Sequence, residues 1–193
     1  KLGNIVNAQG AQLTGFMANA AGVLQTGSPT VININTADIA PQSTTSIAMI
    51  ANLNSTKSVP ANTPFSPTDV TTYNDSTSVN VYDSLGNPHV FQTFYVKNAA
   101  LNSWDVYGTL DGTQIGATAL TTLGFTNLGA LNSVSGNLGP TYPNAVSVSA
   151  PVATGAVTPL TFRFDFSSST QFGSAFSVSK NLQDGYASGK LAK

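Results

Sequence analysis

Side chains that could carry out chemistry are sparse in this sequence. The only histidine, His89, follows Pro88 in a segment with the composition of a turn between two strands. A catalytic triad or a histidine-based zinc site would need partners, but the chain has no cysteine, no glutamate and no second histidine. We therefore expect His89 to be a partly exposed turn residue. We predict no catalytic, cofactor-binding or metal-binding residues.

The eight acidic residues are all aspartates. Their positions are predicted to lie in turns or on the solvent side of strands, which disfavours a pair of carboxylates for glycoside hydrolysis. Asp111-Gly112 and Asp184-Gly185 lack the repeated oxygen-ligand spacing of a calcium-binding loop. Both pairs are predicted to be turns, at which only an adventitious ion would bind.

Three aromatic residues, Trp104, Tyr95 and Tyr107, could together form a platform for a sugar. Aromatic residues on adjacent strands more often pack as cross-strand pairs in a core, and we favour that interpretation. The sequence has neither a Gly-x-Gly-x-x-Gly motif after a strand nor a P-loop, so no nucleotide site is predicted.

The elements that would position these residues are strands. Residues 78–97 alternate apolar and polar side chains on either side of a turn at 83–88, which is typical of a β-hairpin. Residues 103–110 follow as a third strand, and the three segments predict a β-meander. In residues 160–166 the three phenylalanines should face a core, while Arg163 and Asp165 should face solvent.

Other parts of the chain are predicted with the same rules of alternation and turn composition. Residues 54–72 contain three prolines and are expected to form an extended connection, and residues 167–173 are expected to form a loop. No internal repeat is evident. The remaining strand candidates are residues 5–6, 12–16, 29–35, 46–53, 118–123, 124–128, 145–149 and 175–179.

The composition of the chain limits the fold classes and functions that it can have. Only 8% of the residues are charged, the net charge is −1, and the basic residues are scattered, so binding to nucleic acid or to an anionic membrane is not expected. Serine and threonine are abundant and strong helix formers are few, which favours an all-β fold. The chain has no membrane-spanning apolar run and no cationic signal peptide at its start. A nearly uncharged surface suits either packing against copies of itself or a soluble extracellular module.

Four segments, in order along the chain, resemble the bacterial flagellar hook protein family. The most specific is the Val-Tyr-Asp-Ser-x-Gly-Asn-x-His pattern at residues 81–89, which leads to an aromatic strand and then to a strand with Trp104. The other three are residues 6–15, residues 43–45 with 52–56 and 63–66, and residues 183–191. Residues 110–160 carry no motif that we recognise.

The resemblance implies a layered subunit in which an outer β domain is inserted into a middle β domain. It assigns residues 1–40 to the N-terminal part of the middle domain, 41–184 to an outer antiparallel β-barrel or sandwich, and 185–193 to the return segment. The family's terminal helical segments are not in this sequence. The chain by itself is therefore expected to be a monomer.

The resemblance also implies a function. The hook joins motor and rod to the filament as a universal joint, so the chain would be a structural subunit, not an enzyme, with weak and slidable contacts and without a cofactor. Its partners would be other copies of itself, the hook cap, the rod and the hook–filament junction proteins, outside the cell in the flagellar hook. The alternatives are another axial protein, such as a rod or hook-associated protein, an adhesin-like or glycan-binding β-sandwich, and, last, a hydrolase.

Overall fold

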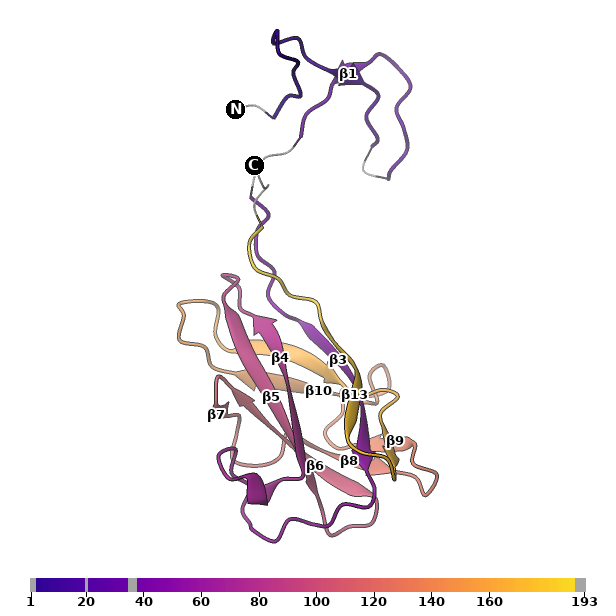
Figure 1. The fold of residues 1–193 in the computed structure, drawn as a ribbon, viewed down its shortest axis with the longest axis vertical. Helices are drawn as coiled ribbons and strands as arrows, with labels where there is room; N and C mark the ends of the chain where they lie inside the picture. The colour runs from indigo at the N-terminus through magenta and orange to yellow at the C-terminus, as the bar shows by residue number, and fades with distance from the viewer. Residues whose placement is uncertain (1–2, 20, 35–37, 190–193) are drawn as a thin grey trace. The chain divides into compact units, whose positions relative to one another are not determined.

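The computed structural model describes residues 3–19, 21–34 and 38–189, and these residues are almost entirely in strands, turns and loops (Figure 1). The all-β prediction is confirmed. The chain divides into two compact units, one made of Lys1–Ala40 with Ser188–Lys193 and the other of Pro41–Ala187. No helix in the described part of the chain is long and apolar enough to cross a bilayer.

The smaller unit is built from short antiparallel pairings. Its strands β1 (Thr14–Gly15) and β2 (Thr30–Val31) pair with each other, and single bridges such as Val6 with Gln12 extend the arrangement. The sequence predicted longer strands here. Most of the unit's large apolar side chains are exposed, so little burial supports longer pairing.

The first sheet of the larger unit is antiparallel throughout, in the order β4-β5-β6-β8-β9, with β7 paired to β6. The predicted hairpin and meander are confirmed, since Tyr82 pairs with Pro88 at the hairpin end and Phe94 pairs with Tyr107 across the next two strands. The strands are β4 (Asp75–Tyr82), β5 (Pro88–Lys97), β6 (Ser103–Leu110), β7 (Thr113–Gln114), β8 (Thr121–Phe125) and β9 (Leu131–Val134).

The second sheet is mixed, which differs from the antiparallel expectation. Its centre, β3 (Ser46–Asn54), pairs in parallel with β11 (Leu160–Asp165) and β12 (Thr170–Phe172), and antiparallel with β13 (Ser177–Gln183). The last member, β10 (Ala145–Ala150), pairs with β11. Parallel neighbours need a long crossover, and here the whole first sheet lies in the connection between β3 and β10. Strand β12 lies where a loop was predicted.

The core lies between the two sheets. Phe91 of the first sheet packs edge-to-face against Phe162 and Phe164 of the second, with ring centroids 5.0 and 5.4 Å apart. Two polar contacts also cross the core: the Tyr95 hydroxyl donates to Met49 Sδ at 2.9 Å, and Trp104 Nε1 donates to Gln171 Oε1 at 2.5 Å. The larger unit is thus a face-to-face β-sandwich.

Hydrogen bonds connect the two sheets at both edges. On one side the Thr44 amide donates to Tyr82 O at 2.9 Å, and the Tyr82 amide donates to Thr44 Oγ1 at 2.9 Å. On the other side the Gln171 amide donates to Gly129 O at 2.8 Å. These links satisfy edge groups that would otherwise be open to pairing, and they give the sandwich a barrel-like closure.

The long connection between β3 and β4 covers the outer face of the first sheet. Phe65 stacks on Tyr107 with centroids 4.1 Å apart and lies 5.2 Å from Phe94, whose other neighbour is Tyr73 at 4.9 Å. As predicted, the connection has little regular structure, apart from a 3₁₀ turn, η1 (Val70–Thr72). The aromatic contacts explain how a segment rich in proline is held in one place.

Candidate functional site: the His89 cluster and the neighbouring hollow

His89 is a core-facing residue of β5. It lies directly opposite Val81 of β4, and only 5% of its surface is exposed, so the expectation of a partly exposed turn residue is wrong. The reason is that alternate residues of a strand face the same side, and His89 shares its side of β5 with Phe91 and Tyr95, which are fully buried. The alternation of residues along this strand was the signal that could have placed it.

Asp83 is fully buried in the turn of the β4–β5 hairpin. The amides of Leu85 and Asn87 each donate to Oδ1 at 2.9 Å, and Oδ2 accepts from Asn87 Nδ2 at 2.9 Å and Thr154 Oγ1 at 2.5 Å. Asp83 therefore lies in a turn, as predicted, but this turn is buried because the loop that carries Thr154 covers it.

The imidazole of His89 lies between two carboxylates. Its Nδ1 is 2.6 Å from Asp111 Oδ2, and its Nε2 is 3.3 Å from Asp83 Oδ2. Asp111 belongs to the turn between β6 and β7, and its Oδ1 accepts a hydrogen bond from the Val90 amide at 2.8 Å. The β4–β5 hairpin, the β6–β7 turn and the loop that carries Thr154 therefore meet at one end of the sandwich.

The pKa values of His89, Asp83 and Asp111 are set by burial and by hydrogen bonding, which shift each pKa in opposite directions. Burial alone would lower the pKa of His89, but hydrogen bonds to Asp111 and Asp83 and the charges of both carboxylates outweigh it and raise that pKa. Burial would raise the pKa of Asp83, yet hydrogen bonds from Thr154, Asn87 and His89 hold it well below its usual range. The pKa of Asp111 is also lowered, because its bonds to His89 and Val90 outweigh its desolvation.

The arrangement is suited to holding segments together. With both ring nitrogens facing carboxylates, His89 has no free nitrogen directed at a substrate, as a general base would require. Within residues 3–19, 21–34 and 38–189, no cluster of three or more His, Cys, Asp or Glu side chains could hold a metal ion.

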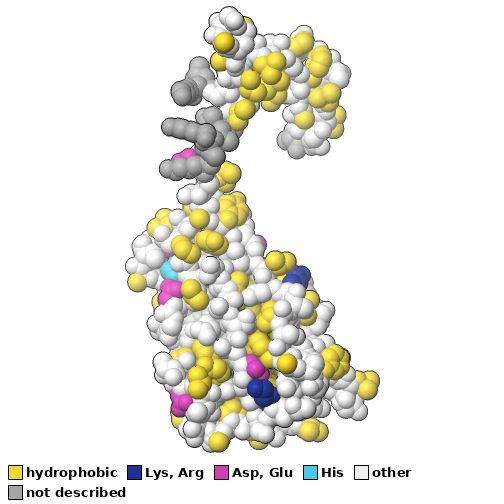
Figure 2. Space-filling view, viewed as in Figure 1, with side chains coloured by type: hydrophobic (Ala, Val, Ile, Leu, Met, Phe, Trp, Pro, Cys, Tyr) yellow, Lys and Arg dark blue, Asp and Glu magenta, His cyan; other side chains and the backbone are white. Residues whose placement is uncertain are grey.

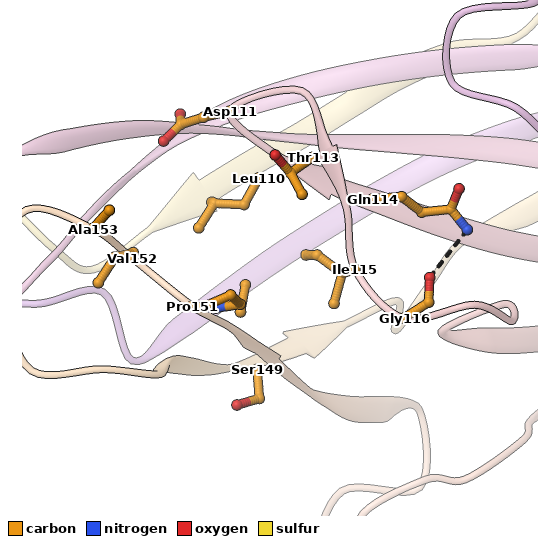
Figure 3. A pocket seen from close by; sticks show the side chains of 11 residues that line it. Leu110, Asp111, Thr113, Gln114, Ile115, Gly116, Ser149, Pro151, Val152 and Ala153 are labelled. Carbon is orange, nitrogen blue, oxygen red and sulfur yellow. Dashed lines mark hydrogen bonds between the residues drawn. The ribbon is translucent and has the colours of Figure 1, made fainter.

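A hollow of about 560 Å³ lies beside the cluster, between the β6–β7 turn and the segment that follows β10. Figure 3 shows Leu110 and Ile115 on one side of it, Pro151 and Val152 on the other, and Asp111 at its edge. Its lining is mostly apolar, and Asp111 is the one charged residue among the side chains that surround it. The sequence offered no sign of this hollow, because its walls come from segments about 40 residues apart and from the region without a recognised motif.

The aromatic residues considered as a sugar platform are structural. Trp104 and Tyr95 are completely buried, which confirms the core interpretation. Neither has an aromatic cross-strand partner: Trp104 pairs with Lys97 and Leu123, and Tyr95 pairs with Asp75 and Val106. An aromatic cross-strand pair is found instead between Phe94 and Tyr107.

Asp111-Gly112 is a turn, as predicted, but Asp184-Gly185 is not: these two residues lie in an irregular segment directly after β13. Asp111 and Gly112 both have positive φ, at 49° and 80°, in the tight turn between β6 and β7. Asp184 accepts hydrogen bonds from the amides of Thr45 and Ser46 at 2.8 and 3.0 Å and from the Thr45 hydroxyl at 2.6 Å. These bonds lower the pKa of Asp184 despite its partial burial, and they connect the start of β3 to the end of β13.

The surface of the larger unit has few charges. Figure 2 shows a few blue and magenta side chains among many uncharged ones on the face in view. Part of the charge is paired, since Lys57 Nζ is 3.8 Å from Asp75 and Arg163 lies over the Tyr142 ring at 4.2 Å. An exposed face of hydroxyls, amides and single apolar residues is consequently what the unit offers to other molecules.

Comparison with known proteins identifies relatives over nearly the whole chain. The profile of the flagellar basal body protein FlaE D2 domain matches residues 52–186. The chain is 39% identical over 195 residues to the flagellar hook protein FlgE of Salmonella typhimurium and 37% identical over 196 residues to that of Escherichia coli. In both comparisons 97% of this chain aligns, and it spans 45% of the relative.

A solved structure agrees with the fold. The flagellar hook protein FlgE2 of Helicobacter pylori superposes with a TM-score of 0.55 at 11% identity, covering 98% of this chain and 72% of that one. At this identity the likeness speaks for the architecture alone.

Proposed function

The chain belongs to the flagellar hook protein family, and from this premise we propose that it is part of a structural subunit of the bacterial flagellar hook, outside the cell. In this proposal residues 41–184 are the outer domain, and residues 1–40 and 185–193 are parts of the middle domain. The match of the D2 domain profile to residues 52–186 carries the proposal. The compact unit Pro41–Ala187 supports the division into domains.

The protein works by contact and not by catalysis. Its one histidine is engaged by two carboxylates, and Trp104 and Tyr95 are buried in the core. The glycan-binding alternative finds no support, because a platform that includes Trp104 would need that side chain on the surface. The partners are other copies of the subunit and, in the complete assembly, the hook cap, the rod and the hook–filament junction proteins.

The composition suits contacts that break and form again as a curved hook rotates. Interfaces that slide must be small and weak, and moving a buried ion away from its partner would be costly. With 8% charged residues, neighbouring subunits can shift past one another while few ions lose their partners. The rigid, edge-closed sandwich keeps its own shape while the contacts change.

The test introduces charge on the outer domain of the full-length subunit. Ser78, Ser147 and Thr161 are exposed strand residues, and each is changed to lysine in one strain and to asparagine in a matched control. We expect the lysine variants to give straightened or unstable hooks and reduced swimming, while the neutral asparagine variants behave as the parent. Normal hooks and motility across the lysine set would contradict the proposal.

A further inference from the structure

We propose that His89 holds the β6–β7 turn against the β4–β5 hairpin in a way that depends on pH. This turn forms one wall of the hollow. When His89 is protonated, its imidazole donates to Asp111 and Asp83 at the same time and holds the turn against the hairpin. When it loses the proton, the bond to Asp111 is released and that wall loosens. This behaviour is independent of the role proposed for the chain in the hook.

The number of ring protons determines how many carboxylates the imidazole can satisfy. An imidazolium has two N–H donors, which matches carboxylates placed 2.6 Å from Nδ1 and 3.3 Å from Nε2. A neutral imidazole has one N–H, so one of the two carboxylates would then face a nitrogen lone pair. Two acceptors facing each other repel, and one contact must open.

Exposure decides which contact opens. Asp83 is fully buried and is held by donors from Leu85, Asn87 and Thr154, so it cannot reach water or turn away. The side chain of Asp111 is 53% exposed, and water can replace His89 as its partner at little cost. The neutral tautomer that keeps its proton on Nε2, toward Asp83, is therefore favoured.

The two walls of the hollow are attached differently. The wall from Leu110 to Gly116 is tied to the hairpin through the Asp111 side chain and the Val90 backbone. The segment that follows the other wall is tied by Thr154 to Asp83 and by the Val157 amide to Ser84 Oγ at 2.9 Å, contacts that do not involve His89. Only the first wall should respond to the proton.

Within the described residues, Asp83 and Asp111 are the ionisable groups that hydrogen-bond or ion-pair with the ring. The strand β4 presents Val81 opposite His89, and the covering loop presents Thr154, neither of which titrates. The proton therefore passes between His89 and solvent in a field set by Asp83 and Asp111.

The test uses the 193-residue chain, in which His89 is the only imidazole and gives a single NMR signal to follow with pH. Its midpoint should lie above the ordinary value of about 6.5. As pH rises through that midpoint, hydrogen exchange at residues 111–116, corrected for its intrinsic pH dependence, should accelerate about tenfold, as expected for the loss of one charge-assisted hydrogen bond. Exchange at residues 154–157 should not change.

Asp111→Asn is the matched variant, because its amide oxygen can still accept from Val90 while the carboxylate charge is gone. The imidazole midpoint should fall, and exchange at 111–116 should no longer follow it. Asp69→Asn is the control, since Asp69 precedes β4 whereas His89 pairs near the end of β4. A parent midpoint at or below 6.5, a midpoint unchanged in Asp111→Asn, or equal loosening of 154–157 would each overturn the inference.

Discussion

His89 shows how a residue chosen by turn composition can belong to a core. Pro88, Asn87 and Gly86 indicate a turn correctly, but β5 begins within that turn, at Pro88. From there the two-residue period puts His89 in line with Phe91. Burial of a histidine requires hydrogen-bond acceptors, which Asp83 and Asp111 provide here. The sequence did not indicate these acceptors, because Asp111 comes close to His89 only through the pairing of β5 with β6.

The same residues predict how stability depends on pH. Because the folded pKa of His89 is raised, its contribution is fully present below about 6.5 and is lost as pH rises through the folded value. Because the folded pKa values of Asp83 and Asp111 are lowered, their contributions are present above about 4 and are lost as pH falls through the folded values. The free energy of unfolding should be greatest between about pH 4 and 6.5.

Urea denaturation of the parent chain at pH values within this range and on both sides of it, up to pH 9, measures how the free energy of unfolding depends on pH. In Asp111→Asn the decline on the alkaline side should be smaller, since His89 has lost its closer partner. A parent free energy of unfolding that climbs steadily from pH 6 to pH 9 would be inconsistent with this assignment.

At the scale of elements, local patterns identified strands well where a strand packs on the core through alternate residues. The meander of β4, β5 and β6 and the phenylalanine strand β11 were predicted, and Phe162, Phe164 and Phe166 are buried as expected. Strand β12 was missed because it has three residues and no alternation of its own, and its partner β3 lies over 100 residues earlier. Parallel pairing is likewise set by tertiary structure and leaves no local pattern.

The edge link at Gly129 gives a prediction at this scale. Gly129 has φ of 82°, and a Cβ there would lie 2.6 Å from Gln171 O, at the point where the two sheets are joined. Gly129→Ala should lower the free energy of unfolding by roughly 2–5 kcal/mol, combining backbone strain with displacement of β12.

Gly136→Ala is the matched control. Gly136 also has positive φ, at 66°, but a Cβ added there would meet nothing within 4 Å, so only the strain of roughly 1–2 kcal/mol should appear. Thermal and urea unfolding of both variants measure the difference. Equal losses would show that the edge link does not matter to the sandwich.

At the scale of the whole molecule, composition and four short segments were enough to indicate the family, whereas the hollow and the His89 cluster depend on distant segments. Low charge, abundant serine and threonine, and the Val81–His89 pattern were all readable in the sequence. The Asp83, His89 and Asp111 contacts and the closure of the sandwich at both edges needed the fold. A closed sandwich with a sparsely charged surface is consistent with a building block that contacts its own copies.

The most direct measurement is the location of this chain on the flagellum. Antibodies raised against the 193-residue chain, detected by gold particles in electron micrographs of flagella from the bacterium that encodes it, should decorate the short curved hook along its outer surface. The filament should remain bare. Label confined to the rod or the filament, or absent from intact hooks, would contradict the assignment of this sandwich to the outer layer of the hook.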